Sequence, residues 1–231
     1  MSGDAVTLTH RRLSTPRSAA VAGILFAVLL GAALALIRVS IPADPADGGA
    51  WLNERAGTVK LALSLVPFAG IAFLWFIGVV RDHFGELEDR LFSTVFLGSG
   101  LLFLAMVFAS AAMTGGLLAT YAVIPNQMVE SGLYSFGRQT VYQIANVYAM
   151  RMAGVFMISL GTIWVRTRIM PRWLALVTYG LALLLLVSLG YNLWVTLIFP
   201  TWVLIISIYI LVLNFRRERA GAGDGLSPVV E

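Results

Sequence analysis

The fold of this chain is decided by stretches such as residues 19–37, which read AAVAGILFAVLLGAALALI. The stretch contains no charged side chain and, as a helix, matches the roughly 20 apolar residues that cross a bilayer core. Five further stretches of this kind follow, at about 61–80, 91–114, 143–165, 173–190 and 193–215. The pattern predicts an all-α, polytopic membrane protein with six transmembrane helices within residues 18–215. The polar segments 1–17 and 216–231 are expected to be disordered cytoplasmic tails.

The composition is that of a membrane protein. Hydrophobic residues make up 59% of the chain and charged residues 12%, whereas about 25% of the residues of a soluble domain are charged. The mean hydropathy is +0.86. There is no cysteine, which excludes disulfides, iron–sulfur clusters and thiolate metal sites. The basic residues behind the net charge of +4 stand beside the spans and give no indication of nucleic-acid binding.

The basic residues also predict the orientation, since Lys and Arg near span ends are enriched on the cytoplasmic side. With the N-terminus inside, the inner segments hold Arg11, Arg12, Arg17, Arg81, Arg90, Arg166, Arg168, Arg172, Arg216, Arg217 and Arg219. The outer segments hold only Arg38, Arg55, Lys60 and Arg138. We therefore predict that both termini are cytoplasmic. Abundant Arg, Ala and Gly, which share GC-rich codons, indicate a bacterial plasma membrane.

Two patterns concern helix packing. Small residues recur at every fourth position of the first span: Ala19, Gly23, Ala27, Gly31 and Ala35. Such a stripe lets helices approach closely in lipid, and we favour an internal contact over one between protomers, without excluding the second. Pro67 and Pro200 are predicted to kink their helices.

The spans lack the residues that much membrane chemistry needs. None contains Asp, Glu or His, which excludes a buried carboxylate relay, bis-histidine haem and a Ser–His protease. We therefore expect no cofactor and no metal. We also do not expect an enzyme, because no span offers an acid–base pair.

Arg151 is the one charged residue inside a span, about 12 Å deep if Trp164 marks the inner edge, or roughly 8–9 Å with a small shift of the bundle. An ionisable group at such a depth is a functional-site hypothesis by default. We predict an outward-facing polar pocket, formed by Arg151, Tyr148, Glu130, Arg138, Asn146 and Gln143. The alternative, which we weigh slightly higher, is a structural arginine bonded to helix carbonyls.

Three functions remain open. The pocket could bind a lipid or a small anionic or amphipathic molecule. The chain could form a channel or transporter, with the stripe of the first span as a contact in a homo-oligomer. It could also be an accessory or assembly subunit that needs a membrane-complex partner. Membrane lipids are the expected partners in each case.

Three stretches carry a resemblance: LVPFAGIAFLWFIGVVR at 65–81, EDRLFSTVFLGSG at 88–100 and NVYAMRM at 146–152. They resemble a group of uncharacterised six-span bacterial membrane proteins, of actinobacterial type and unknown function. The resemblance would cover about 18–215. It implies the same topology and a plasma-membrane location, and it brings no catalytic residue.

Overall fold

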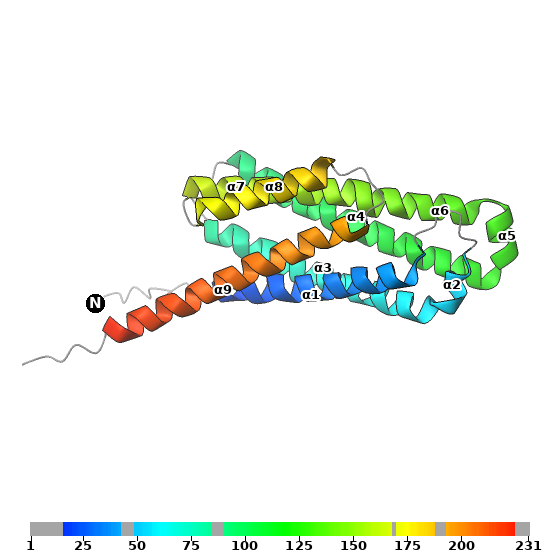
Figure 1. Cartoon of the computed structure of the whole chain (residues 1–231), viewed down its shortest axis with the longest axis horizontal. Helices are drawn as coiled ribbons and strands as arrows, with labels where there is room; N and C mark the ends of the chain where they lie inside the picture. Colours follow the sequence, from blue (N-terminus) through cyan, green and yellow to red (C-terminus); the bar gives the residue numbers. More distant parts are fainter. Residues whose placement is uncertain (1–15, 43–48, 85–89, 168–169, 188–192, 225–231) are drawn as a thin grey trace, which may run out of the picture.

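The computed structural model describes residues 16–42, 49–84, 90–167, 170–187 and 193–224, and all elements in these ranges are helical (Figure 1). The elements are α1 (Pro16–Ser40), α2 (Trp51–Glu54), α3 (Ala56–Phe84), α4 (Arg90–Val123), α5 (Pro125–Glu130), α6 (Leu133–Tyr142), the π-helix η2 (Gln143–Tyr148), α7 (Ala149–Thr167), α8 (Arg172–Val187), the 3-10 helix η3 (Leu193–Leu197) and α9 (Ile198–Asp224). The predicted fold class, an all-helical bundle, is confirmed for these residues.

Five segments are long and apolar enough to cross a membrane. They are Arg17–Ser40, Ala56–Arg81, Leu91–Val123, Leu133–Thr167 and Trp194–Phe215. The predicted span 173–190 corresponds to α8, an apolar helix of only 16 residues, and its last predicted residues lie outside the described ranges. Figure 1 shows the start of α1 and the end of α9 at the same end of the bundle. The six-span topology with cytoplasmic termini stays a prediction.

The helices around the fourth span are longer than the sequence predicted. α4 has 34 residues, and α6, η2 and α7 follow one another as a single helical segment, Leu133–Thr167, of 35 residues. Each is about 50 Å long, against a bilayer core of roughly 30 Å. The segment 116–142, which lies between the predicted third and fourth spans, is therefore mostly helical. A run of apolar residues marks only the part of a helix that lies inside the bilayer, because a helix that extends beyond the bilayer can carry polar residues.

A short turn connects the two long helices at the end of the bundle that carries α2 and α5. We call this end outer, and the opposite end inner, after the predicted orientation. Pro125 is the first residue of α5, where its missing N–H costs nothing, and Gly132 has a φ of +76° at the start of α6. Together with α2, this end encloses a small hydrophobic cluster of its own, formed by Trp51, Leu52, Val59, Leu117, Leu118, Met128 and Tyr134. We call this region the outer cap.

Phenylalanine rings fill the middle of the bundle. Phe26 of α1 lies 4.5 Å from Phe73 of α3, and Phe103 of α4 lies 4.6 Å from Phe199 of α9, between ring centroids. Phe156 of α7 completes the cluster and lies 5.4 Å from Phe73. All five rings are fully buried. The aromatic cluster joins α1, α3, α4, α7 and α9 and closes the bundle at this level.

The stripe of small residues on α1 divides into two halves. Its inner half is buried against other helices, and a Cβ on Gly23 would meet Ser207 of α9 and Phe76 of α3. Its outer half is not: a Cβ on Gly31 would meet nothing within 4 Å, and Ala35 is exposed. The inner half is thus an internal contact, in agreement with the packing of α1 on α3 and α9.

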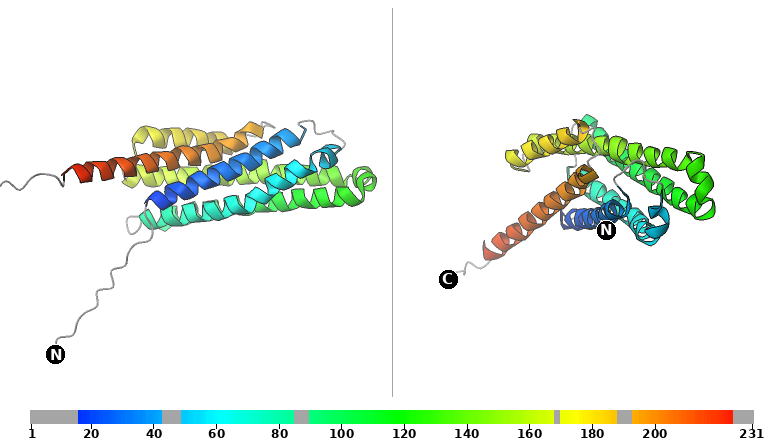
Figure 2. Two further views of the ribbon diagram at one scale, coloured as in Figure 1. Left: turned by 90° about the horizontal axis from the view of Figure 1, so that it is seen from below. Right: turned by 45° about the vertical axis from the view of Figure 1, so that its right-hand side comes forward.

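The two prolines differ in position. Pro67 lies inside α3, as the sequence predicted. Pro200 lies inside the apolar segment Trp194–Phe215, where it is the third residue of α9, directly after η3. In the first turn a proline removes no intrahelical hydrogen bond, and the kink expected at Pro200 stays a prediction. α9 then runs to Asp224, nine residues past the predicted end of the span, and its last part leaves the other helices (Figure 2).

Candidate functional site

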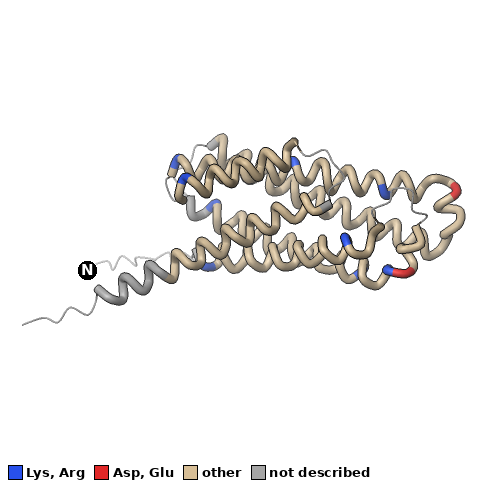
Figure 3. The backbone as a smooth tube through the Cα atoms, viewed as in Figure 1, with Lys and Arg blue, Asp and Glu red and all other residues tan. Residues whose placement is uncertain are grey.

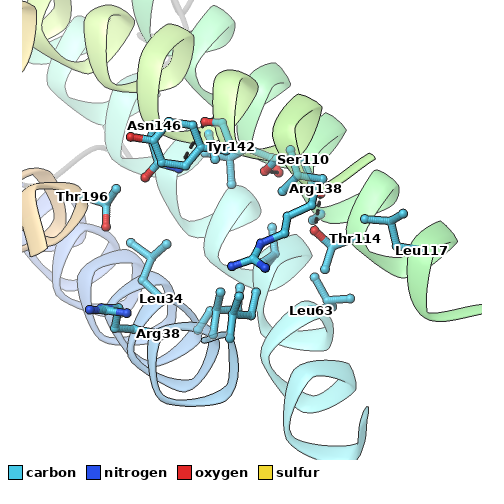
Figure 4. A pocket seen from close by; sticks show the side chains of 18 of the residues that line it. Leu34, Arg38, Leu63, Ser110, Thr114, Leu117, Arg138, Tyr142, Asn146 and Thr196 are labelled. Atoms are coloured by element: carbon cyan, nitrogen blue, oxygen red, sulfur yellow. Dashed lines mark hydrogen bonds between the residues drawn. The ribbon is translucent and has the colours of Figure 1, made fainter. Parts of the chain in front are cut away.

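A cavity of about 180 Å³ lies between α1, α3, α4 and the segment α6–η2 (Figure 4). Its inner part is apolar, with Leu30, Val107 and Met150 in the walls. Phe103 of the aromatic cluster also lines it and closes its floor. At the outer end stand residues of a different kind: Arg38, Trp51, Arg138, Gln139, Asn146 and Thr196.

Arg138 is held by two hydrogen bonds at the outer end of the cavity. Its Nη2 donates to the carbonyl oxygen of Pro42 at 2.7 Å, and its Nη1 donates to the hydroxyl of Tyr134 at 3.3 Å. Tyr134 is only 2% exposed and also accepts a hydrogen bond of 2.9 Å from the indole Nε1 of Trp51. The outer cap therefore fixes the position of this guanidinium group. Figure 4 shows the side chain reaching from α6 towards α1.

Arg38 is held much more loosely. It stands in the last turn of α1, where a cation interacts favourably with the helix dipole. Its guanidinium carbon lies 6.0 Å from the centroid of the Trp194 ring, and its buried Nε has no hydrogen-bond partner. A guanidinium group carries five N–H donors. Arg38 is thus the lining residue with the most unused capacity to bind an anion.

The other polar groups of the cavity mostly bond to their own helices. The hydroxyls of Ser110 and Thr114 donate to carbonyls three and four residues earlier, and Asn146 donates its amide to Tyr142. Figure 4 places Asn146 and Thr196 on the same side of the cavity as Arg38. No described lining residue is Asp or Glu. The outer end of the cavity is therefore cationic.

The π-helix η2 forms part of the cavity wall through Ala145 and Asn146. π-Helical turns are rare and occur frequently at functional sites, because they shift the register of a helix locally. Here η2 lies between α6, which carries Arg138, and α7, which carries Met150. Residues 143–148 contain neither Gly nor Pro, so no sequence signal announced the change.

The structure brings together only part of the predicted pocket. Arg138 and Asn146 line the cavity, whereas Arg151, Tyr148, Gln143 and Glu130 are not among its lining residues. Glu130 lies before the start of α6, and Arg151 lies 18 residues after that start, about 27 Å along the helix. Glu130 and Arg151 therefore do not meet. Arg151 is half-buried, and the structure shows no hydrogen bond or ion pair between it and the described part of the chain.

Sequence reasoning missed Arg38, Trp51 and Thr196. The sequence did contain a signal for Arg38, since it is one of the few basic residues on the predicted outer side. A cation at a span end has an ordinary explanation as an interface residue, and this explanation concealed its place in the cavity. Nothing in the local sequence connected Trp51 with Tyr134.

No protein-family model, curated protein or solved structure matches this chain. The resemblance to six-span actinobacterial membrane proteins therefore stays a prediction.

Proposed function

We propose that this protein is an integral plasma-membrane protein that binds an anionic amphiphile in the outer cavity. Arg38 binds the acidic group, Arg138 adds positive charge, and the apolar walls take up the hydrocarbon. The observation that carries the proposal is the pair of arginines at one end of an otherwise apolar cavity, with no carboxylate among the described lining residues. We also propose six spans with both termini in the cytoplasm.

The depth of the cavity supports a ligand from the outer leaflet. Arg17 and Arg38 are 21 residues apart on α1, about 31 Å, which equals the thickness of a bilayer core. With Arg17 at the inner surface, Arg38 lies at the outer headgroup level and the apolar walls lie below it. Figure 3 shows basic residues near both ends of the bundle, and the acidic residues it marks lie at the end with α2 and α5.

The size of the cavity limits what it encloses. A cavity of about 150 Å³ lined by apolar residues takes up benzene. The volume here, about 180 Å³, therefore suits roughly six carbon atoms beside the acidic group. A longer chain must continue between the helices into the bilayer, which favours a lipid or detergent-like molecule over a small metabolite.

A channel or transporter finds less support. Such a protein needs a polar path to the cytoplasm, and the floor of the cavity is Phe103, backed by the buried rings of Phe73 and Phe199. A role as an accessory subunit, and assembly into a homo-oligomer, stay predictions.

The proposal is tested by titrating the full-length protein, in nanodiscs of a zwitterionic lipid, with an alkyl phosphate. Charge-assisted hydrogen bonds contribute about 1.5–3 kcal/mol each, so Arg38→Leu should weaken binding about tenfold to a hundredfold. Arg55→Leu is the matched control, since Arg55 is an exposed outer arginine that does not line the cavity. An alcohol of the same chain length and inorganic phosphate should each bind weakly. Equal binding of the alkyl phosphate to wild type and Arg38→Leu would refute the proposal.

A further inference from the structure

Arg151 stands at the outer end of α8, as the register between α7 and α8 shows. A Cβ on Gly154 would lie 3.1 Å from the carbonyl oxygen of Ala182 and 3.0 Å from Leu186. One further contact of this kind, between Gly161 and Thr178, fixes the two helices as antiparallel. Arg151 lies three residues from Gly154 in the outward direction, so it stands at the level of Val187, the last residue of α8.

The side chain lies at the seam where α7 meets α8 and lipid. Arg151, Val155, Ile158 and Thr162 share one face of α7 and are all half-buried. Thr162 is hydrogen-bonded to the hydroxyl of Tyr179 on α8, at 3.0 Å, so this face borders α8. One turn further out on the same face, Tyr148 is 58% exposed.

The described part of α8 ends at the level of Arg151. Its 16 residues extend about 24 Å, roughly 6 Å less than the bilayer core. Arg166, in the last turn of α7, marks the inner surface, and Arg151 lies 15 residues from it, about 22 Å along the helix. In a bilayer core of roughly 30 Å, Arg151 is then roughly 8 Å below the outer surface. A long arginine side chain can reach towards the headgroups over much of that distance.

We propose that Arg151 binds the phosphate of an outer-leaflet phospholipid at the outer end of α8, in a second site separate from the cavity. A charged arginine at this depth costs on the order of 2.5–3.5 kcal/mol when unpaired. The described part of the chain supplies neither a carboxylate nor a hydrogen bond to this guanidinium. A phospholipid phosphate at the headgroup level supplies both a counter-charge and hydrogen-bond acceptors to this side chain. Tyr148 stands where an amphipathic ring borders the headgroups.

The competing role is structural. The last carbonyls of α8 have no partner within their helix and carry the negative end of its dipole, so Arg151 could serve only to cap them. A cap stabilises the fold and binds no lipid. The two roles are separated when lipid binding and stability are measured on the same variants.

The experiment counts bound phosphatidylglycerol on the full-length protein by native mass spectrometry and measures thermal unfolding in parallel. Arg151→Leu and Arg151→Gln should each lose one tightly bound lipid, while Arg151→Lys should keep it. In the background of Arg38→Leu, which removes the cavity arginine, Arg151→Leu should still lose one further lipid. Excess inorganic phosphate should not displace it.

Two results would overturn the inference. In the first, the lipid count stays unchanged in Arg151→Gln, whether or not the unfolding temperature falls, which assigns Arg151 to capping. In the second, inorganic phosphate displaces the lipid, which assigns the site to a free anion. Failure of the cavity variants to change alkyl phosphate binding would contradict the proposed function and leave this second site unaffected.

Discussion

Arg138 and Pro42 are joined by a hydrogen bond of 2.7 Å although 96 residues separate them in the chain. The bond ties α6 to the segment that follows α1, directly at the outer end of the cavity. Because Tyr134 receives hydrogen bonds from both Arg138 and Trp51, the same cluster connects α2 as well. The position of the outer cap and the cationic character of the cavity are therefore coupled.

Tyr134→Phe tests this coupling. Removing the hydroxyl leaves Trp51 Nε1 without its buried acceptor and loosens Arg138, so the free energy of unfolding should fall by about 1–3 kcal/mol. Alkyl phosphate binding should also weaken, by less than in Arg38→Leu. Tyr121→Phe is the control, since Tyr121 packs against the same cluster and no hydrogen bond of its hydroxyl is seen within the described residues. Equal behaviour of the two variants would show that the hydroxyl of Tyr134 does not position Arg138.

Gly23→Ala tests the inner half of the α1 stripe. The added Cβ would overlap Ser207 and approach Phe76 to 2.9 Å, so the variant should lose about 1–3 kcal/mol of stability. Gly31→Ala is the matched control on the same stripe. It meets open space and should be neutral or slightly stabilising, because alanine has the higher helix propensity. Thermal unfolding of both variants in one detergent decides the matter, and a larger loss in Gly31→Ala would instead indicate a contact between protomers.

Thr178 and Trp202 test the packing of α8 on α9. The indole Nε1 donates to the buried hydroxyl of Thr178 at 3.0 Å. Hydrogen bonds between membrane helices contribute about 0.6 kcal/mol on average, and at most about 1.7. A double-mutant cycle of Thr178→Val and Trp202→Phe should give a coupling energy in this range. A coupling indistinguishable from zero would mean that the bond does not hold α8 in place.

The π-helix η2 is tested by deleting Ile144, a half-buried residue that does not line the cavity. One residue fewer restores α-helical register and turns α6 by about 100° relative to α7. Arg138 should then lose its bond to Pro42, and binding of the alkyl phosphate should fall several-fold while the helix content measured by circular dichroism is retained. Unchanged binding would show that η2 has no role in forming the site.

The helices could be predicted from the sequence, and the cavity could not. The length of an apolar stretch indicates how much of a helix is buried in lipid. The stretches at 19–37 and 61–80 therefore predicted both ends of α1 and α3 to within a few residues. This length does not report where a helix stops once it leaves the bilayer. For this reason α4 and the continuous segment Leu133–Thr167 are longer than the predicted third and fourth spans. An apolar run also does not show that η3 precedes α9, shortly before Pro200.

Arg138 and Asn146 were predicted to belong to the site, whereas Arg38, Trp51 and Thr196 were missed for another reason. A cavity arises from the distance between helices, which depends on side chains far apart in the chain, such as Arg38 and Arg138. The sequence singled out Arg151 because it stands alone in a span. The helix register instead places it at the end of α8, away from the cavity, and this position is the basis of the second lipid site inferred above.

The most direct test of the central claim is a density map of the full-length protein purified in native lipid. We predict density for an acidic headgroup beside Arg38, on the side of Thr196 and Asn146, with a hydrocarbon chain descending towards Phe103. A cavity that holds only water, or one that continues as a water-filled path past Phe103 to the cytoplasmic end, would contradict the account.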